Sequence, residues 1–160
     1  MRRIITIAVA AALLTLGGAA AGLADDTVSF QAQLVKPQLV SVSCEAGVCD
    51  LVFEGTGATT IMGPITWTAH VIQDFTVSPC NPTEAETILV AATGSITLAS
   101  DEGTVVCQSS TPGGPAFISG DWVITEGTGE FVGITGSGTS QGVIGGGGPI
   151  VHHSGAVAYR

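Results

Sequence analysis

The sequence predicts an all-β protein that forms a single antiparallel β-barrel of about eight strands. Apolar and polar residues alternate with a period of two along much of the chain, and no segment has the pattern of a convincing amphipathic helix. Turn signals rich in Gly and Pro separate the alternating segments at short intervals. Because few cationic side chains are available to protect exposed strand edges, a closed or nearly closed barrel is favoured. A β-sandwich is the alternative.

The first strand is expected at Val28–Leu34, where apolar and polar residues alternate, and Lys36-Pro37 is expected to end it. Segment Thr83–Ala92 is the closest helical candidate, but its apolar run Ile88-Leu89-Val90 favours a strand. The other expected strands are Leu39–Ser43, Val48–Glu54, Ile65–Val77, Glu86–Ala92, Ser95–Ala99, Thr104–Gln108, Ala116–Glu126, Phe131–Gly142 and Ile150–Tyr159.

The amino-terminal segment has the three parts of an export signal. Arg2 and Arg3 precede an uncharged apolar run, Ile4–Leu16, and the small residues needed for cleavage follow at Gly22-Leu23-Ala24. A membrane anchor is the alternative, but this run of 13 residues falls short of the roughly 20 needed to span a bilayer. We therefore expect a signal peptide at residues 1–24, a secreted β-barrel domain at 25–160, and no membrane association once the signal is removed.

Composition limits the function classes. The 160 residues include four Lys+Arg and 13 Asp+Glu, a formal charge of −9. Cleavage after Ala24 would leave two cations, Lys36 and Arg160, and a formal charge of −11 with the same 13 acids. Such an acidic chain is not a nucleic-acid binder, because it lacks the clustered cations that neutralise phosphates. The sequence leaves the oligomeric state open.

Four cysteines, an even number in an exported chain, favour two disulfide bonds. Three pairings are available. Cys44 and Cys49 flank a Gly-containing turn that closes a hairpin, so we prefer that bridge, with Cys80–Cys107 as the second. A metal site is the alternative, but the spacing lacks the paired ligands of zinc motifs, so we expect no metal.

The densest motif runs from Trp122 to Gly136. Gly127 and Gly129 allow positive backbone angles in a tight turn, and Phe131 is expected to anchor the next strand in the core. Gly133 and Gly136 allow close approach or strong bending.

This motif resembles the segment shared by allene oxide cyclases and dirigent proteins, a Gly-Gly-Ser/Thr-Gly-x-Phe run followed by a small residue and another glycine. The matching positions are Gly127, Thr128, Gly129, Phe131, Gly133 and Gly136. Glu126 departs from the first glycine of that run, and Thr135 stands where dirigent proteins have an arginine. The resemblance covers roughly 15 residues. It implies an eight-stranded barrel whose interior holds an apolar small molecule, but it carries over no catalytic residue.

Several catalytic patterns lack the context that they require. Gly138–Gly142 fits Gly-x-Ser-x-Gly, but that motif needs a strand-to-helix turn and an acid between the serine and its histidine. His152 and His153 are adjacent, so on a strand they point to opposite faces, and one of them is expected to face solvent. His70 lies about 13 Å along a strand from Asp74, too far for a direct pair. Catalytic residues therefore stay unassigned, and no cofactor is expected.

Trp67, His70 and Trp122 are the candidate ligand-binding residues, with core packing the alternative for both tryptophans. Asp121 and Glu126 are either surface acids or a pair at the barrel mouth. Three functions are compatible with the sequence. The first is a secreted barrel that binds a small hydrophobic molecule or serves as an interaction module. The second is a cofactor-independent cyclase or isomerase, which requires a buried ionisable group in the lumen, and the third is a module that binds proteins through Gly-rich loops.

Overall fold

A computed structural model describes residues 26–76, 80–100, 104–108, 116–144 and 150–159. The expected signal peptide lies outside these residues. The described residues form nine strands and one 3-10 helix: β1 Val28–Glu45, β2 Val48–Thr59, β3 Gly63–Asp74, β4 Cys80–Ala91, β5 Gly94–Ser100, β6 Val105–Gln108, β7 Ala116–Gly127, η1 Gly129–Phe131, β8 Ile134–Ile144 and β9 Ile150–Tyr159.

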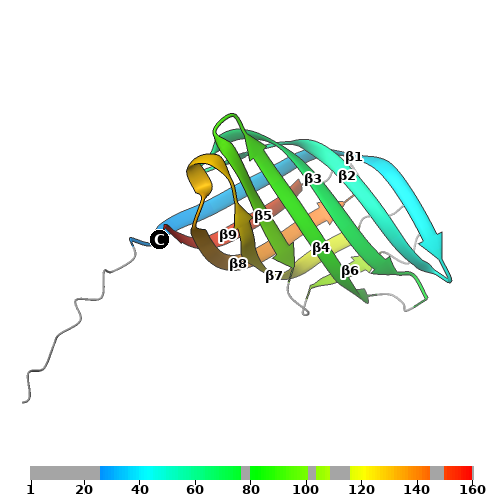
Figure 1. Cartoon of the computed structure of the whole chain (residues 1–160). Helices are drawn as coiled ribbons and strands as arrows, with labels where there is room; N and C mark the ends of the chain where they lie inside the picture. The colour runs from blue at the N-terminus through cyan, green and yellow to red at the C-terminus, as the bar shows by residue number, and fades with distance from the viewer. Residues whose placement is uncertain (1–25, 77–79, 101–103, 109–115, 145–149, 160) are drawn as a thin grey trace, which may run out of the picture.

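The strands form a closed antiparallel barrel, as predicted (Figure 1). Eight of them follow one another around the barrel in the order β3-β2-β1-β9-β8-β7-β5-β4, and the pairing of β3 with β4 closes it. The ninth, β6, pairs with β4 and β7 in the region beyond the end of β5. Because every barrel strand except β1 has two neighbours along most of its length, the barrel leaves few backbone groups unpaired.

Several predicted strand boundaries are wrong. β2 runs on to Thr59 and not only to Glu54, β3 ends at Asp74, and β4 begins at Cys80 and not at Glu86. β1 continues through Lys36-Pro37, where a bulge interrupts its pairing with β2 and Lys36 adopts a φ of 52°. The pairing of β1 with β9 ends one residue earlier, at Val35, so the missing N–H of Pro37 removes no ladder hydrogen bond to β9. Phe131 belongs to η1, and the following strand begins at Ile134. The segment considered as a helix lies in β4, as its apolar run favoured.

Side chains fill the barrel at the end that η1 covers. The core there includes Phe30, Ile65, Leu89, Ile96, Trp122, Phe131, Ile134 and Val157, all at most 5% exposed. Phe131 is thus a core residue, as predicted. Gly129 has a positive φ of 61°, and a Cβ on it would lie 2.1 Å from the carbonyl oxygen of Thr93. A side chain at Gly129 would therefore separate η1 from the β4–β5 hairpin.

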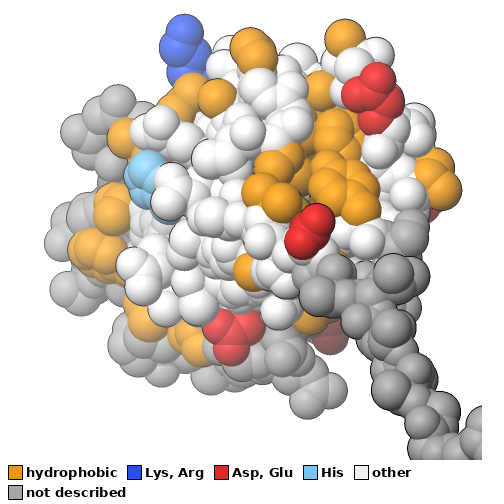
Figure 2. Space-filling view, turned by 90° about the vertical axis from the view of Figure 1, so that its left-hand side faces the viewer, with side chains coloured by type: hydrophobic (Ala, Val, Ile, Leu, Met, Phe, Trp, Pro, Cys, Tyr) orange, Lys and Arg blue, Asp and Glu red, His pale blue; other side chains and the backbone are white. Residues whose placement is uncertain are grey.

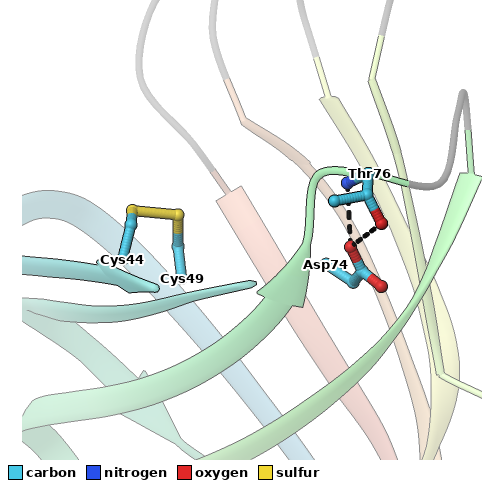
Figure 3. The surroundings of a disulfide bond; sticks show 4 residues. All are labelled: Cys44, Cys49, Asp74 and Thr76. Carbon is cyan, nitrogen blue, oxygen red and sulfur yellow. Dashed lines mark hydrogen bonds between the residues drawn. A yellow bond between two sulfur atoms is a disulfide. The ribbon is translucent and has the colours of Figure 1, made fainter. Parts of the chain in front are cut away.

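The Cys44–Cys49 disulfide joins directly opposed residues at the β1–β2 hairpin, as predicted (Figure 3). Beside it, the hydroxyl and the backbone N–H of Thr76 donate to Asp74 Oδ1 over 2.6 and 2.8 Å and lower the pKa of that carboxyl. Cys107 is also disulfide-bonded and lies opposite Cys80 in the strand register. The side chain of Cys80 is outside the described set, so the second pairing stays a prediction.

The described surface carries many acids and one Lys or Arg, Lys36. Figure 2 views the η1 end of the barrel, where hydrophobic side chains gather with acidic side chains beside them. No helix within the described residues is long and apolar enough to cross a membrane.

Candidate functional site

The barrel lumen is filled at the η1 end and hollow beyond it. A cavity of about 120 Å³ lies between the filled end and the Cys44–Cys49 hairpin. Its apolar walls include Leu34, Leu51, Phe53, Trp67, Val71, Leu98, Trp122 and Val151. Its polar lining residues include Gln73, Thr87, Ser100, Thr104, Ser140 and His153. The described lining contains no Asp, Glu, Lys or Arg. This combination of mostly apolar walls and a few polar groups is typical of small-molecule sites.

Both candidate tryptophans are buried and line this cavity. Trp67 Nε1 donates to the carbonyl of Thr56 over 2.9 Å, and Trp122 Nε1 donates to the carbonyl of Thr139 over 3.0 Å. Because each indole N–H already has a partner on a neighbouring strand, what the rings present to the lumen is apolar surface.

Glycines create the space in which these indole rings lie. A Cβ added at Gly55 would lie 2.6 Å from the Trp67 ring, and Cβ atoms at Gly138 and Gly155 would lie 2.6 and 2.8 Å from the Trp122 ring. Each ring therefore packs directly against the backbone of a strand. These strand glycines shape the cavity wall through the tryptophans that they accommodate.

The three histidines occupy different environments. His70 is exposed and does not line the cavity, because Trp67, Ala69 and Val71 occupy the inward positions of β3. The parity of the strand could have shown this, since residues 67 and 70 point to opposite faces. His152 is exposed and His153 is 6% exposed, as the prediction that one of the pair faces solvent required.

His153 is the ionisable group that the structure places in the lumen. Its Nδ1 lies 2.7 Å from Ser140 Oγ on β8, and its ring meets the ring of Trp122 edge to face, with centroids 6.4 Å apart. Burial, and to a smaller extent the nearby His152, lower the pKa of His153 to about 4. The imidazole is therefore neutral near pH 7.

Two of the residues that line the cavity each have a buried polar atom without a partner. Gln73 is 4% exposed, and its side-chain nitrogen Nε2 has no hydrogen-bond partner. The same is true of His153 Nε2. A buried polar atom without a partner costs about 1–3 kcal/mol, so a molecule that hydrogen-bonds to either atom would recover part of that cost. Sequence reasoning missed Gln73, Ser140 and His153 as site residues.

The lumen does not contain the machinery of a serine hydrolase. Ser140, the serine of the Gly-x-Ser-x-Gly match, lies within β8 and not at a strand-to-helix turn. Asp121 and Glu126 are both exposed, and neither lines the cavity. Ser140 and His153 therefore form a pair without an acidic third member among the described lining residues. No group of three or more potential metal ligands was found in the described part of the chain.

The apolar lining continues beyond the cavity along the β1–β2 extension. Leu39 pairs with Phe53 and Val42 pairs with Leu51, so each pair shares the face that lines the cavity. Leu39 and Val42 are each 52% exposed. We call Leu39, Val42, Leu51 and Phe53 the apolar ledge. Figure 1 shows the two strands that carry it running on together to the far end of the barrel from η1.

Comparison with known proteins gave no match: no protein-family model, curated protein or solved structure is significantly similar to this chain.

Proposed function

We propose that this protein is a secreted, non-catalytic β-barrel that binds a small, mainly apolar molecule in its lumen. The observation that carries the proposal is the cavity, whose walls are apolar apart from a few polar side chains, two of which have unpartnered nitrogens. A packed core of this composition would be expected to leave neither the space nor the unpaired atoms. A bound molecule would supply both packing contacts and hydrogen bonds.

The cavity volume limits the part of a ligand that the lumen encloses. A cavity of about 150 Å³ lined by apolar side chains accepts benzene. The volume here, about 120 Å³, therefore suits a group of roughly one ring. A longer molecule would place the remainder of its apolar surface on the ledge.

Two further points support the proposal without depending on the cavity. The predicted export signal and the preference of the cysteines for disulfides favour an extracellular protein. The segment from Gly127 to Gly136 resembles that of allene oxide cyclases and dirigent proteins, whose barrels hold apolar small molecules. In this chain the segment spans the end of β7, η1 and the start of β8 at the filled end of the barrel.

Native mass spectrometry of protein purified from culture medium tests this proposal. We expect a retained low-mass ligand, or binding of added single-ring apolar compounds. Ala85 lines the cavity, so Ala85→Phe should reduce both. Ala156→Phe is the matched control, because Ala156 is exposed on β9. A folded wild-type protein that retains nothing and binds no such compound would contradict the proposal.

The alternative function is a cofactor-independent cyclase or isomerase that acts on a reactive polyene or ketone. His153 favours it, since that hypothesis requires an ionisable group in the lumen. Its low pKa makes it a weaker base than an ordinary histidine, which is why we prefer binding without chemistry. If the substrate is a ketone, an enolisable ketone incubated with the protein in D2O should gain deuterium at the carbon beside its carbonyl. His153→Gln should abolish that exchange.

A further inference from the structure

The Ser140–His153 contact determines which ring nitrogen of His153 carries the proton. A neutral imidazole has one N–H donor and one acceptor nitrogen. Among the described residues, His153 is the one hydrogen-bond partner of the Ser140 side chain. If Nδ1 donated to Ser140, the serine proton would have no acceptor among the residues that the structure describes. The arrangement that uses the serine proton has Ser140 donating to Nδ1, which leaves the histidine proton on Nε2.

The second unpartnered atom is also a donor. Gln73 Nε2 is an amide nitrogen with two N–H groups, and it has no hydrogen-bond partner. Both residues line the same cavity, Gln73 from β3 and His153 from β9. Two residues of the described lining therefore carry an N–H donor without a partner, within walls that are otherwise mainly apolar.

Charge narrows the ligand class further. The described lining has no Lys or Arg that would pair with a carboxylate, and no Asp or Glu that would pair with an amine. An ion would lose its hydration on entry without gaining a countercharge. Neutral molecules should therefore be preferred over ions of either sign.

From these observations we infer that the cavity recognises a neutral molecule in which an apolar ring carries a carbonyl-type acceptor, such as a ketone, ester or lactone. This inference rests on the proposed binding function and adds its chemical selectivity. Gln73 and His153 are the donors, and Ser140 is a positioning residue that holds the histidine tautomer. The indole rings of Trp67 and Trp122 contact the apolar part.

Binding of four single-ring probes tests the inference: acetophenone, ethylbenzene, benzoate and protonated 1-phenylethylamine. Acetophenone and ethylbenzene have the same carbon skeleton and differ in the carbonyl oxygen. A hydrogen bond is worth about 1 kcal/mol net, so acetophenone should bind roughly five- to tenfold more tightly than ethylbenzene. The two ions should bind more weakly than acetophenone. Calorimetry or tryptophan fluorescence gives the dissociation constants.

Variants show which residues provide the preference for acetophenone over ethylbenzene. Gln73→Met should lower the preference for acetophenone over ethylbenzene, because ethylbenzene has no acceptor for the N–H donor that the variant removes. The double variant Ser140→Ala/His153→Leu should do the same, because it removes both members of a buried pair. His70→Leu is the matched control, since His70 is exposed outside the cavity.

A direct readout of the tautomer does not depend on any ligand. Nitrogen-15 NMR should show the proton of neutral His153 on Nε2 in the wild type. Ethylbenzene binding as tightly as acetophenone, or a proton found on Nδ1, would overturn the inference and leave the binding function standing. Failure of all four probes, together with no retained ligand, would overturn the binding function itself.

Discussion

At the scale of single residues, the most consequential group is a histidine buried without a charged partner. His153 is 6% exposed, and its pKa is lowered to about 4 by burial first and by His152 second. The unfolded chain restores an ordinary histidine pKa near 6.5, so in acid the unfolded state binds a proton more readily than the folded state. Folding stability is therefore linked to this group.

We predict that the free energy of unfolding falls as the pH drops from about 6.5 to about 4. The shift of His153 corresponds to roughly 3 kcal/mol of stability that is present above pH 6.5 and lost by pH 4. Urea unfolding at several pH values measures this dependence. His153→Leu in the Ser140→Ala background should flatten it between these limits, whereas His70→Gln should leave it unchanged. An identical pH dependence in the double variant would contradict this account.

A second residue-scale prediction concerns the glycines beneath Trp122. In Gly138→Ala the new Cβ would lie 2.0 Å from the backbone oxygen of Ser154 and 2.6 Å from the indole ring. Overpacking of this kind costs about 1–3 kcal/mol, and it should also shift the Trp122 fluorescence because the ring must move. Gly63→Ala is the control, since a Cβ there meets nothing within 4 Å and only the positive φ of 70° opposes it. Equal fluorescence spectra for Gly138→Ala and the wild type would contradict the packing described.

At the scale of elements, β1 has two roles. Its first half, Val28–Val35, pairs with β9, and from Ala32 onward also with β2, so this half belongs to the closed barrel. After the bulge at Lys36-Pro37 it pairs with β2 alone among the described strands, and its inward side chains Leu39 and Val42 extend the cavity wall. One strand thus builds both the barrel and the ledge.

We predict that the ledge distinguishes long ligands from short ones. Leu39→Ser/Val42→Ser should weaken binding of octanophenone about tenfold, because apolar contact with its alkyl chain is lost, and should change acetophenone binding less than twofold. Val48→Ser is the matched control, since Val48 is 41% exposed and alternates with the inward Cys49. Equal losses for the two ketones would show that the ledge does not contact the ligand.

The sequence predicts elements better than it predicts the site, for a physical reason. Strands and the Cys44–Cys49 hairpin depend on local alternation and on a short turn, which are readable over a few residues. The contact between Ser140 and His153 depends on the register of β8 against β9, and the placement of His153 and Gln73 at one cavity depends on closure of the barrel. Alternation shows that His152 and His153 face opposite ways, but it does not show which one is inside.

At the scale of the whole molecule, repulsion between negatively charged side chains destabilises the folded barrel. The sequence carries 13 Asp+Glu against four Lys+Arg, and Lys36 is the one Lys or Arg in the described ranges. Exposed carboxylates of like sign repel one another more strongly in the folded barrel than in the expanded unfolded chain. Part of the stability gained by closing the barrel is therefore offset by this repulsion.

We predict that the free energy of unfolding at pH 7 rises when the salt concentration is raised from about 10 to 150 mM, because the screening length falls from roughly 30 to 8 Å. Choline chloride should act like sodium chloride, since screening depends on ionic strength and not on a bound cation. Glu45 and Asp50 are exposed acids near the hairpin tip, and Glu45→Gln/Asp50→Asn should reduce the increase. A free energy of unfolding that does not change with salt would contradict this account, because the carboxylates would then be too well solvated to repel one another. An increase confined to sodium chloride would also contradict it, because it would indicate specific binding of sodium ions.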